Sequence, residues 1–180
     1  MGTENFRISS NSIEHLSTDI LKLYYESAQK RMGDYHKQAN DTTDRAYKLI
    51  TVYIGILTLL CGYLYVNWAI TPSIMAIFAL AIGIALATAF ILVIILPRLY
   101  VPLGRSPKEL QPEVYAQYFA QSTDLPDEKR LKLILKDELE MLQGCIDVQE
   151  RKNKNRTFLF TLSLLSALCG IIASAWIMLI

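Results

Sequence analysis

Residues 74–96 read IMAIFALAIGIALATAFILVIIL and contain no Asp, Glu, Lys, Arg or His. Residues 49–66 (LITVYIGILTLLCGYLYV) and 158–180 (FLFTLSLLSALCGIIASAWIMLI) lack the same five residue types. A helix of about 18 or more apolar residues is long enough to cross the roughly 30 Å hydrocarbon core of a bilayer. The sequence therefore predicts an all-α integral membrane protein with three transmembrane helices.

The first two apolar stretches are separated only by residues 67–73, where Trp68 suits headgroup depth and Pro72 suits the first turn of a helix. This spacing predicts a tight helical hairpin. Seven Lys and Arg residues precede the first stretch, and the hairpin turn has none. The positive-inside rule therefore predicts a cytoplasmic N-terminus and a C-terminus on the outer side. Because the first 46 residues are polar, we expect no cleavable signal peptide.

These patterns divide the chain into four segments. Residues 1–48 are predicted to form a cytoplasmic amphipathic helix, 49–96 a two-span hairpin, 97–156 a cytoplasmic loop and long helix, and 157–180 the third span. The first helix is expected to start near Asn11 and Glu14, which are spaced as in a capping box. Its expected buried face repeats at intervals of three and four residues, and comprises Ile13, Leu16, Ile20, Leu23 and Ser27. No Pro or Gly interrupts residues 41–47, so the helix is expected to continue into the first span.

The third segment opens with a stretch rich in Pro and Gly, residues 97–112, which predicts a loop. Asp124, Pro126 and Asp127 then mark the start of a long helix that is expected to continue into the third span. Its apolar positions are close to heptad spacing and comprise Leu131, Leu135, Leu139, Leu142, Ile146 and Val148. This stripe can pair with the first helix of the same chain or with a neighbouring copy.

Small residues recur every four positions in two of the apolar stretches, as Ala79, Gly83 and Ala87 and as Ser166, Gly170 and Ser174. Such ridges permit close contact between membrane helices. They can serve packing within one chain or association of several copies, and both interpretations stay open at this stage.

The apolar stretches lack the ionisable groups that ion-coupled carriers need at membrane depth, which argues against a carrier. The chain has only two histidines, no Gly-rich phosphate loop and no metal-ligand spacing, so no cofactor, no metal and no enzymatic activity are expected. One weak catalytic candidate remains, because Arg31 and His36 fit the Arg-x4-His pattern of HEPN ribonucleases. The alternative for both residues, and for His15, is an ordinary solvated helix face.

Four cations precede the third span, namely Arg151, Lys152, Lys154 and Arg156. They are expected to anchor the span at anionic lipid headgroups. In a ring of several copies, the same cations would form a basic vestibule that favours anions.

The N-terminal helix with its LYY (23–25), KR (30–31) and TDRA (43–46) motifs, followed by a two-span hairpin and a helix that returns to the membrane, resembles small bacterial anti-phage membrane effectors of the SLATT and Pycsar-effector kind. The Arg-x4-His hexapeptide also resembles the HEPN-like accessory membrane proteins of type VI-B CRISPR loci. This resemblance implies a bacterial inner-membrane protein with a periplasmic C-terminus. It also implies that an upstream sensor of phage triggers assembly or opening, which depolarises the membrane. This chain lacks the cyclic-nucleotide-binding domain of such effectors, so its trigger is expected to come from a partner or from assembly.

The leading hypothesis is therefore a homo-oligomeric defence effector that forms or gates a pore. Its expected partners are membrane lipids, further copies of itself and an upstream defence protein or signal, with no direct contact to nucleic acid. Two alternatives remain: a membrane-anchored ribonuclease or nuclease adapter that uses Arg31 and His36, and a passive tether that holds a cytoplasmic partner through its leucine stripe.

Overall fold

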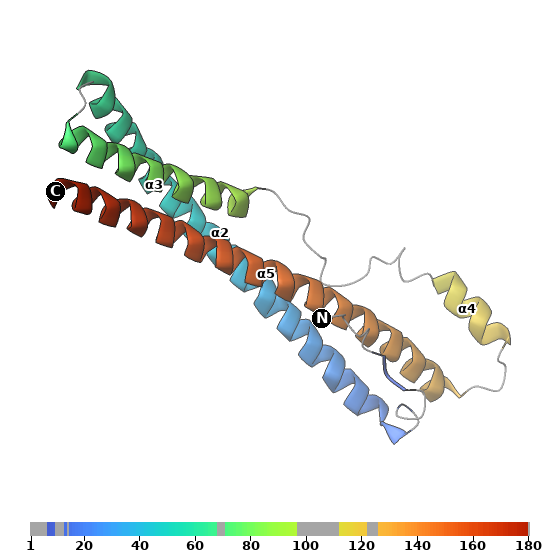
Figure 1. Ribbon diagram of the computed structural model, residues 1–180. Coiled ribbons are helices and arrows are strands. Elements are labelled where there is room, and N and C mark those ends of the chain that lie inside the picture. Colours follow the sequence, from blue (N-terminus) through green and yellow to red (C-terminus); the bar gives the residue numbers. More distant parts are fainter. Residues whose placement is uncertain are drawn as a thin grey trace. The chain divides into compact units, whose positions relative to one another are not determined.

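The computed structural model describes residues 7–9, 13, 15–67, 71–96, 112–121 and 126–179, and its regular elements are all helices. These are α2 (Thr18–Val66), α3 (Pro72–Ile95), α4 (Pro112–Gln121) and α5 (Asp127–Leu179) (Figure 1). Helices α2, α3 and α5 are long and apolar enough to cross a membrane, as the sequence predicted. The helix start expected at Asn11 and Glu14, Trp68, most of the predicted loop (97–111) and Asp124 lie outside the described residues.

Both long helices pass without a break from a polar to an apolar sequence. Helix α2 has 49 residues and α5 has 53, so each includes a predicted span together with the polar segment before it. The chain forms two compact units, to which both helices contribute. The first unit comprises residues 1–37 and 99–151, and the second comprises residues 38–98 and 152–180.

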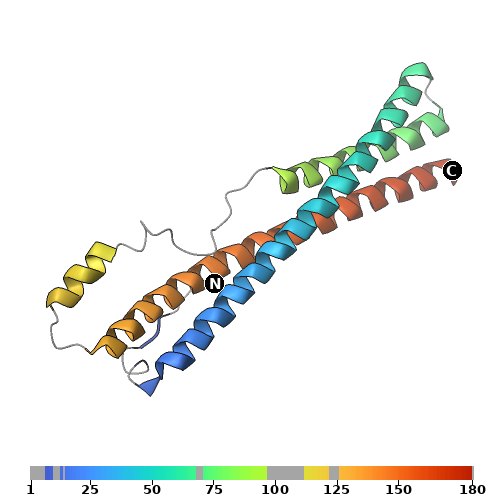
Figure 2. The ribbon, with the colours of Figure 1, turned by 180° about the vertical axis from the view of Figure 1, so that it is seen from behind.

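In the first unit, α2 and α5 lie side by side (Figures 1 and 2). Their contact is apolar: Leu21 packs with Leu139, and Met32 packs with Leu142 and Ile146. Burying one side chain of this size stabilises a fold in water by about 1.5–3 kcal/mol relative to leaving that side chain exposed. This interface holds the polar halves of the two helices together.

The predicted buried face of α2 is wrong at three positions, because Ile20 is 40% exposed, Leu23 is 59% exposed and Ser27 is also exposed. The side that faces α5 instead repeats as Leu21, Tyr25, Ala28, Met32 and Tyr35. This 4-3-4-3 spacing extends farther than the predicted stripe, which gives way to Lys30 and Arg31 after Ser27. The longer apolar repeat buries more surface and therefore determines which side of the helix faces its partner.

The second unit joins the apolar parts of α2, α3 and α5. Its core is built largely from aliphatic and small side chains and comprises Ala46, Tyr53, Ile84, Ala87, Ile91, Ile94 and Ala167. Helix α3 starts as predicted, with Pro72 in its first turn and the Thr71 side chain accepting a hydrogen bond of 3.4 Å from the Ile74 backbone N–H.

The two predicted small-residue ridges meet within one chain in this unit. A Cβ atom added to Gly83 would lie 2.6 Å from the Cα of Gly170 and 3.0 Å from the carbonyl oxygen of Ser166. Only glycine permits this approach, so the backbones of α3 and α5 are in direct contact here. Ala87 is also buried, whereas Ala79, Ser166 and Ser174 are half-buried.

Helix α4 was not anticipated from the sequence, although Pro112 and Glu113 in its first turn are typical helix-start residues. It belongs to the first unit, where the Tyr115 hydroxyl donates a hydrogen bond of 3.2 Å to the Asp137 carboxylate. The Arg130 guanidinium also lies over the Phe119 ring, 5.6 Å from its centroid. These contacts attach α4 to the beginning of α5.

Candidate functional site

The polar contacts between α2 and α5 show that the two helices run parallel. In the second unit, Asn153 Nδ2 donates to Gln38 Oε1 at 3.4 Å, and Arg156 Nη1 donates to the Ala39 carbonyl at 3.4 Å. Sequence numbers on both helices thus rise together, with separations of 115 and 117. In the first unit, Tyr35 and Glu150 show the same separation of 115. Parallel helices enter their apolar parts from the same side, which agrees with one apolar helix, α3, between them along the chain.

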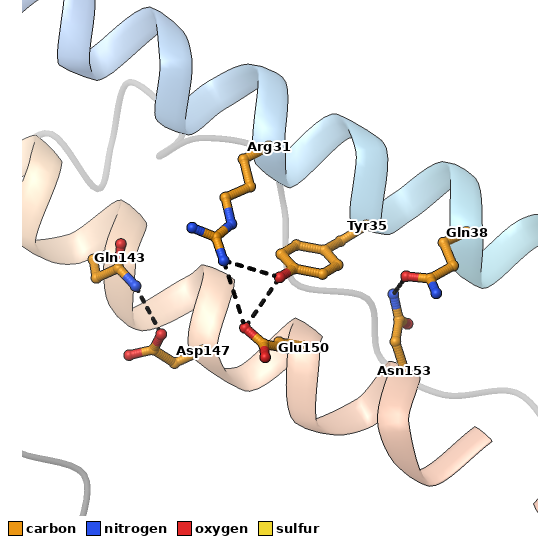
Figure 3. Close-up of polar contacts among 7 residues, drawn as sticks. All are labelled: Arg31, Tyr35, Gln38, Gln143, Asp147, Glu150 and Asn153. Atoms are coloured by element: carbon orange, nitrogen blue, oxygen red, sulfur yellow. Dashed lines mark hydrogen bonds and ion pairs between the residues drawn. The ribbon is translucent and has the colours of Figure 1, made fainter. Parts of the chain in front are cut away.

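The polar cluster of the first unit consists of Arg31, Tyr35 and Glu150 (Figure 3). The Tyr35 hydroxyl donates to Glu150 Oε2 at 3.0 Å and accepts a hydrogen bond of 3.3 Å from Arg31 Nη2. Arg31 Nη2 also lies 3.9 Å from Glu150 Oε2, and its guanidinium lies 5.7 Å from the centroid of the Tyr35 ring. Tyrosine therefore bridges an ion pair across the two helices.

Tyr35 and the neighbouring carboxylates raise the pKa of Arg31 above its ordinary value, with the hydrogen bond to Tyr35 as the largest cause. Arg31 is therefore a permanent cation at any physiological pH. Its side chain is 60% exposed, so the ion pair with Glu150 contributes only about 0–1 kcal/mol to stability. This cluster therefore contributes little to the stability of the first unit.

The two residues of the HEPN-like pattern both lie on α2, which continues as a helix through Gly33. Five residues along an undisturbed helix correspond to a rotation of about 140°, so the two side chains leave the helix in different directions. Arg31 is engaged with Tyr35 and Glu150, while His36 is half-buried. The other histidine, His15, is exposed.

The four cations expected to act together differ in their surroundings. Arg151 and Lys154 are exposed and Lys152 is half-buried, but Arg156 is only 4% exposed. Arg156 faces α2, as its hydrogen bond to Ala39 shows. The expectation that all four face headgroups or a vestibule therefore does not hold for Arg156 in this arrangement.

The sequence did contain a signal for the burial of Arg156. The buried apolar positions Leu139, Leu142 and Ile146 are followed at the same alternating spacing of three and four by Gln149, Asn153 and Arg156, all of which are buried. Extending the heptad beyond its apolar members would have placed these polar residues on the inner side of α5. Leu131 and Val148 depart from this spacing and are exposed.

Most of the predicted pairing stripe of α5 packs against α2 of the same chain. Leu135 and Leu139 pack with Leu21, and Leu142 and Ile146 pack with Met32. None of the three cysteines forms a disulfide; Cys61 and Cys169 are exposed and Cys145 is half-buried. No group of three or more His, Cys, Asp or Glu side chains suited to a metal ion occurs in the described part of the chain.

Comparisons with protein-family models, with curated proteins and with solved structures found no match to this chain. The class of protein therefore rests on the fold and the contacts themselves. In the described part of the chain all regular elements are helices, and three of them can span a membrane. The parts of α2 and α5 that precede the apolar stretches also pack against each other in the first unit.

Proposed function

We propose that this chain is an effector of the bacterial inner membrane that assembles into a homo-oligomer and forms or gates an ion pore. The observation that carries this proposal is that three helices each contain a long apolar stretch, and that these stretches stay largely uncovered in a single chain. Only 6% of the most apolar window of α2, 33% of that of α3 and 17% of that of α5 are buried. Lipid and neighbouring copies are the natural partners of such surfaces.

A pore of this kind needs several copies, because the interior of one chain is filled. In the second unit the backbones of α3 and α5 touch at Gly83 and Gly170, and Ala46, Ile84 and Ala167 fill the remaining core. Since the small-residue ridges are used for this internal contact, copies would associate through other faces. Large side chains such as Leu59 on α2, Phe78 on α3 and Trp176 on α5 remain exposed there.

The defence role is supported by the resemblance to SLATT and Pycsar-type effectors, and the orientation by the distribution of Lys and Arg. On this proposal the first unit lies in the cytoplasm, where an upstream defence protein or signal acts on it. Because α2 and α5 are continuous, a change in their pairing reaches the apolar helices directly.

The test is a depolarisation assay in the bacteria that carry this gene. On phage infection, we expect a potential-sensitive dye to report loss of membrane potential before lysis, with arrest of the infected cells. Cells in which this gene alone is deleted provide the control. Infection that leaves the membrane potential as stable as in the deletion strain would refute the proposal.

A double replacement, Arg31→Ala with His36→Ala, separates the pore from the ribonuclease alternative. Because Arg31 is exposed and its ion pair contributes at most about 1 kcal/mol, the variant is expected to fold and to depolarise infected cells like the wild type. Complete loss of protection in a variant that still inserts at normal abundance would instead favour the ribonuclease.

A further inference from the structure

The inner face of α5 in the second unit is unusually polar for a helix that can span a membrane. Arg156, Ser163 and Gly170 are seven residues apart, which is about two helical turns, so they lie in line on one side. All three are buried in the single chain. Ala167 and Ser174 continue the same side, whereas Leu164, Leu165 and Leu168 lie on the exposed side. We call the set Arg156, Ser163, Ala167, Gly170 and Ser174 the inner face of α5.

Ser163 gives this face its second distinctive feature. Its side chain is 0% exposed, and its hydroxyl has no hydrogen-bond partner among the described residues. Other hydroxyls in the apolar helices bond to the carbonyl four residues earlier: Thr58 to Ile54 at 2.8 Å, and Thr161 to Thr157 at 3.0 Å. A buried hydroxyl without a partner costs free energy, and Ser163 therefore leaves a donor and an acceptor available on this face.

The charges that α5 itself contributes near this face have one sign. From Arg151 to the end of the chain, α5 contains four cations and no Asp or Glu. Arg156 lies on the inner face itself, where its Nη1 donates to the Ala39 carbonyl of α2. A buried guanidinium followed by a hydroxyl two turns later offers hydrogen-bond donors to an anion, and the charge of the guanidinium repels cations.

We propose that the inner face of α5 lines the path of a small inorganic anion, such as chloride, in the open assembly. This inference rests on the proposed pore function and names the surface and the ion that the pore would use. The structure is then the closed arrangement, in which α2 covers Arg156 and the backbone of α3 at Gly83 covers Gly170. Opening separates α2 and α3 from this face, so that water and the anion reach Ser163.

Cysteine labelling tests whether Ser163 lines the path. In a full-length parent chain with Cys61, Cys145 and Cys169 replaced by Ala, Ser163→Cys is compared with Leu165→Cys, which lies on the outer side and is 50% exposed. Ser→Cys is nearly isosteric, so folding is preserved. The proteins are reconstituted in vesicles and treated with a negatively charged methanethiosulfonate while chloride efflux is recorded. Only a thiol that reaches water ionises and reacts.

We expect the reagent to block chloride efflux through Ser163→Cys and to add its mass to that chain, while Leu165→Cys is neither blocked nor modified. A parent that releases chloride while Ser163→Cys stays unmodified overturns the inference but leaves the pore intact. A parent that releases no ion, even when extract of phage-infected cells is enclosed in the vesicles, overturns the proposed function and the inference together.

Ion selectivity provides an independent measurement. Arg156→Gln is expected to abolish the preference for chloride over sodium, because it removes the cation of the inner face. Lys154→Gln is the matched control, since Lys154 is exposed and lies on another side of the same turn. Unchanged selectivity in Arg156→Gln, or an equal loss in both variants, contradicts the assignment.

Discussion

Replacing Gly83 by Ala is expected to lower the free energy of unfolding by about 1–3 kcal/mol, the usual cost of forcing an extra carbon into a closely packed site. The new Cβ would lie 2.6 Å from the Cα of Gly170 and 3.0 Å from the Ser166 carbonyl oxygen. Both are backbone atoms, so no side chain can rotate away and α3 must move as a whole. The gain in helix propensity on replacing Gly by Ala, about 1 kcal/mol, offsets only part of this cost.

Gly62→Ala is the matched control, because it makes the same change in the apolar part of α2 where the added Cβ meets nothing within 4 Å. This variant is expected to be as stable as the wild type or slightly more stable. Unfolding of the detergent-solubilised protein by increasing SDS, followed by circular dichroism, measures both. If Gly83→Ala matched Gly62→Ala, α3 and α5 would not be in backbone contact.

Replacing Leu142 by Ala is expected to cost about 2–5 kcal/mol, as is usual when a buried leucine is truncated and leaves a cavity. Leu142 is 2% exposed and packs with Met32 of α2 and Ile146 of α5. Because this contact lies in the first unit, we expect α2 and α5 to separate there before the apolar helices unfold. Protease sensitivity of residues 18–37 reports that separation.

Val148→Ala is the control for Leu142→Ala, since Val148 belongs to the same predicted apolar stripe but is 45% exposed. A loss below about 0.5 kcal/mol is expected, as for most surface substitutions. Equal losses in the two variants would show that α5 presents a different side to α2.

The long elements were predictable because their signals extend over many residues. Uncharged stretches longer than 17 residues predicted the three helices that can span a membrane, and the lack of breakers predicted that α2 and α5 continue into their polar halves. These signals depend on composition and length alone. They do not indicate which side of a helix meets its partner.

The side of a helix that becomes buried depends on the helix that packs against it. This dependence explains the errors in the predicted buried and exposed residues of α2 and α5. Helix α2 contains two apolar repeats at helical spacing, on different sides. Only the packing of Leu21 and Met32 against α5 shows that the repeat through Ile20 and Leu23 stays exposed. Arg156 was expected among the exposed cations because charged side chains are rarely buried. Its burial follows from the continuing heptad and from the hydrogen bond to Ala39, which lies 117 residues earlier. Such a contact cannot be seen in a local pattern.

Single-channel recording from the purified protein in planar bilayers is the most direct test of the pore. The protein is recorded alone and with a candidate upstream partner, and Leu142→Ala serves as the variant in which the two long helices no longer pair properly. We predict discrete conductance steps that appear or increase with the partner and that the Leu142→Ala variant alters. An electrically silent bilayer under both conditions, with correctly inserted protein, would contradict the proposal that this chain forms or gates a pore.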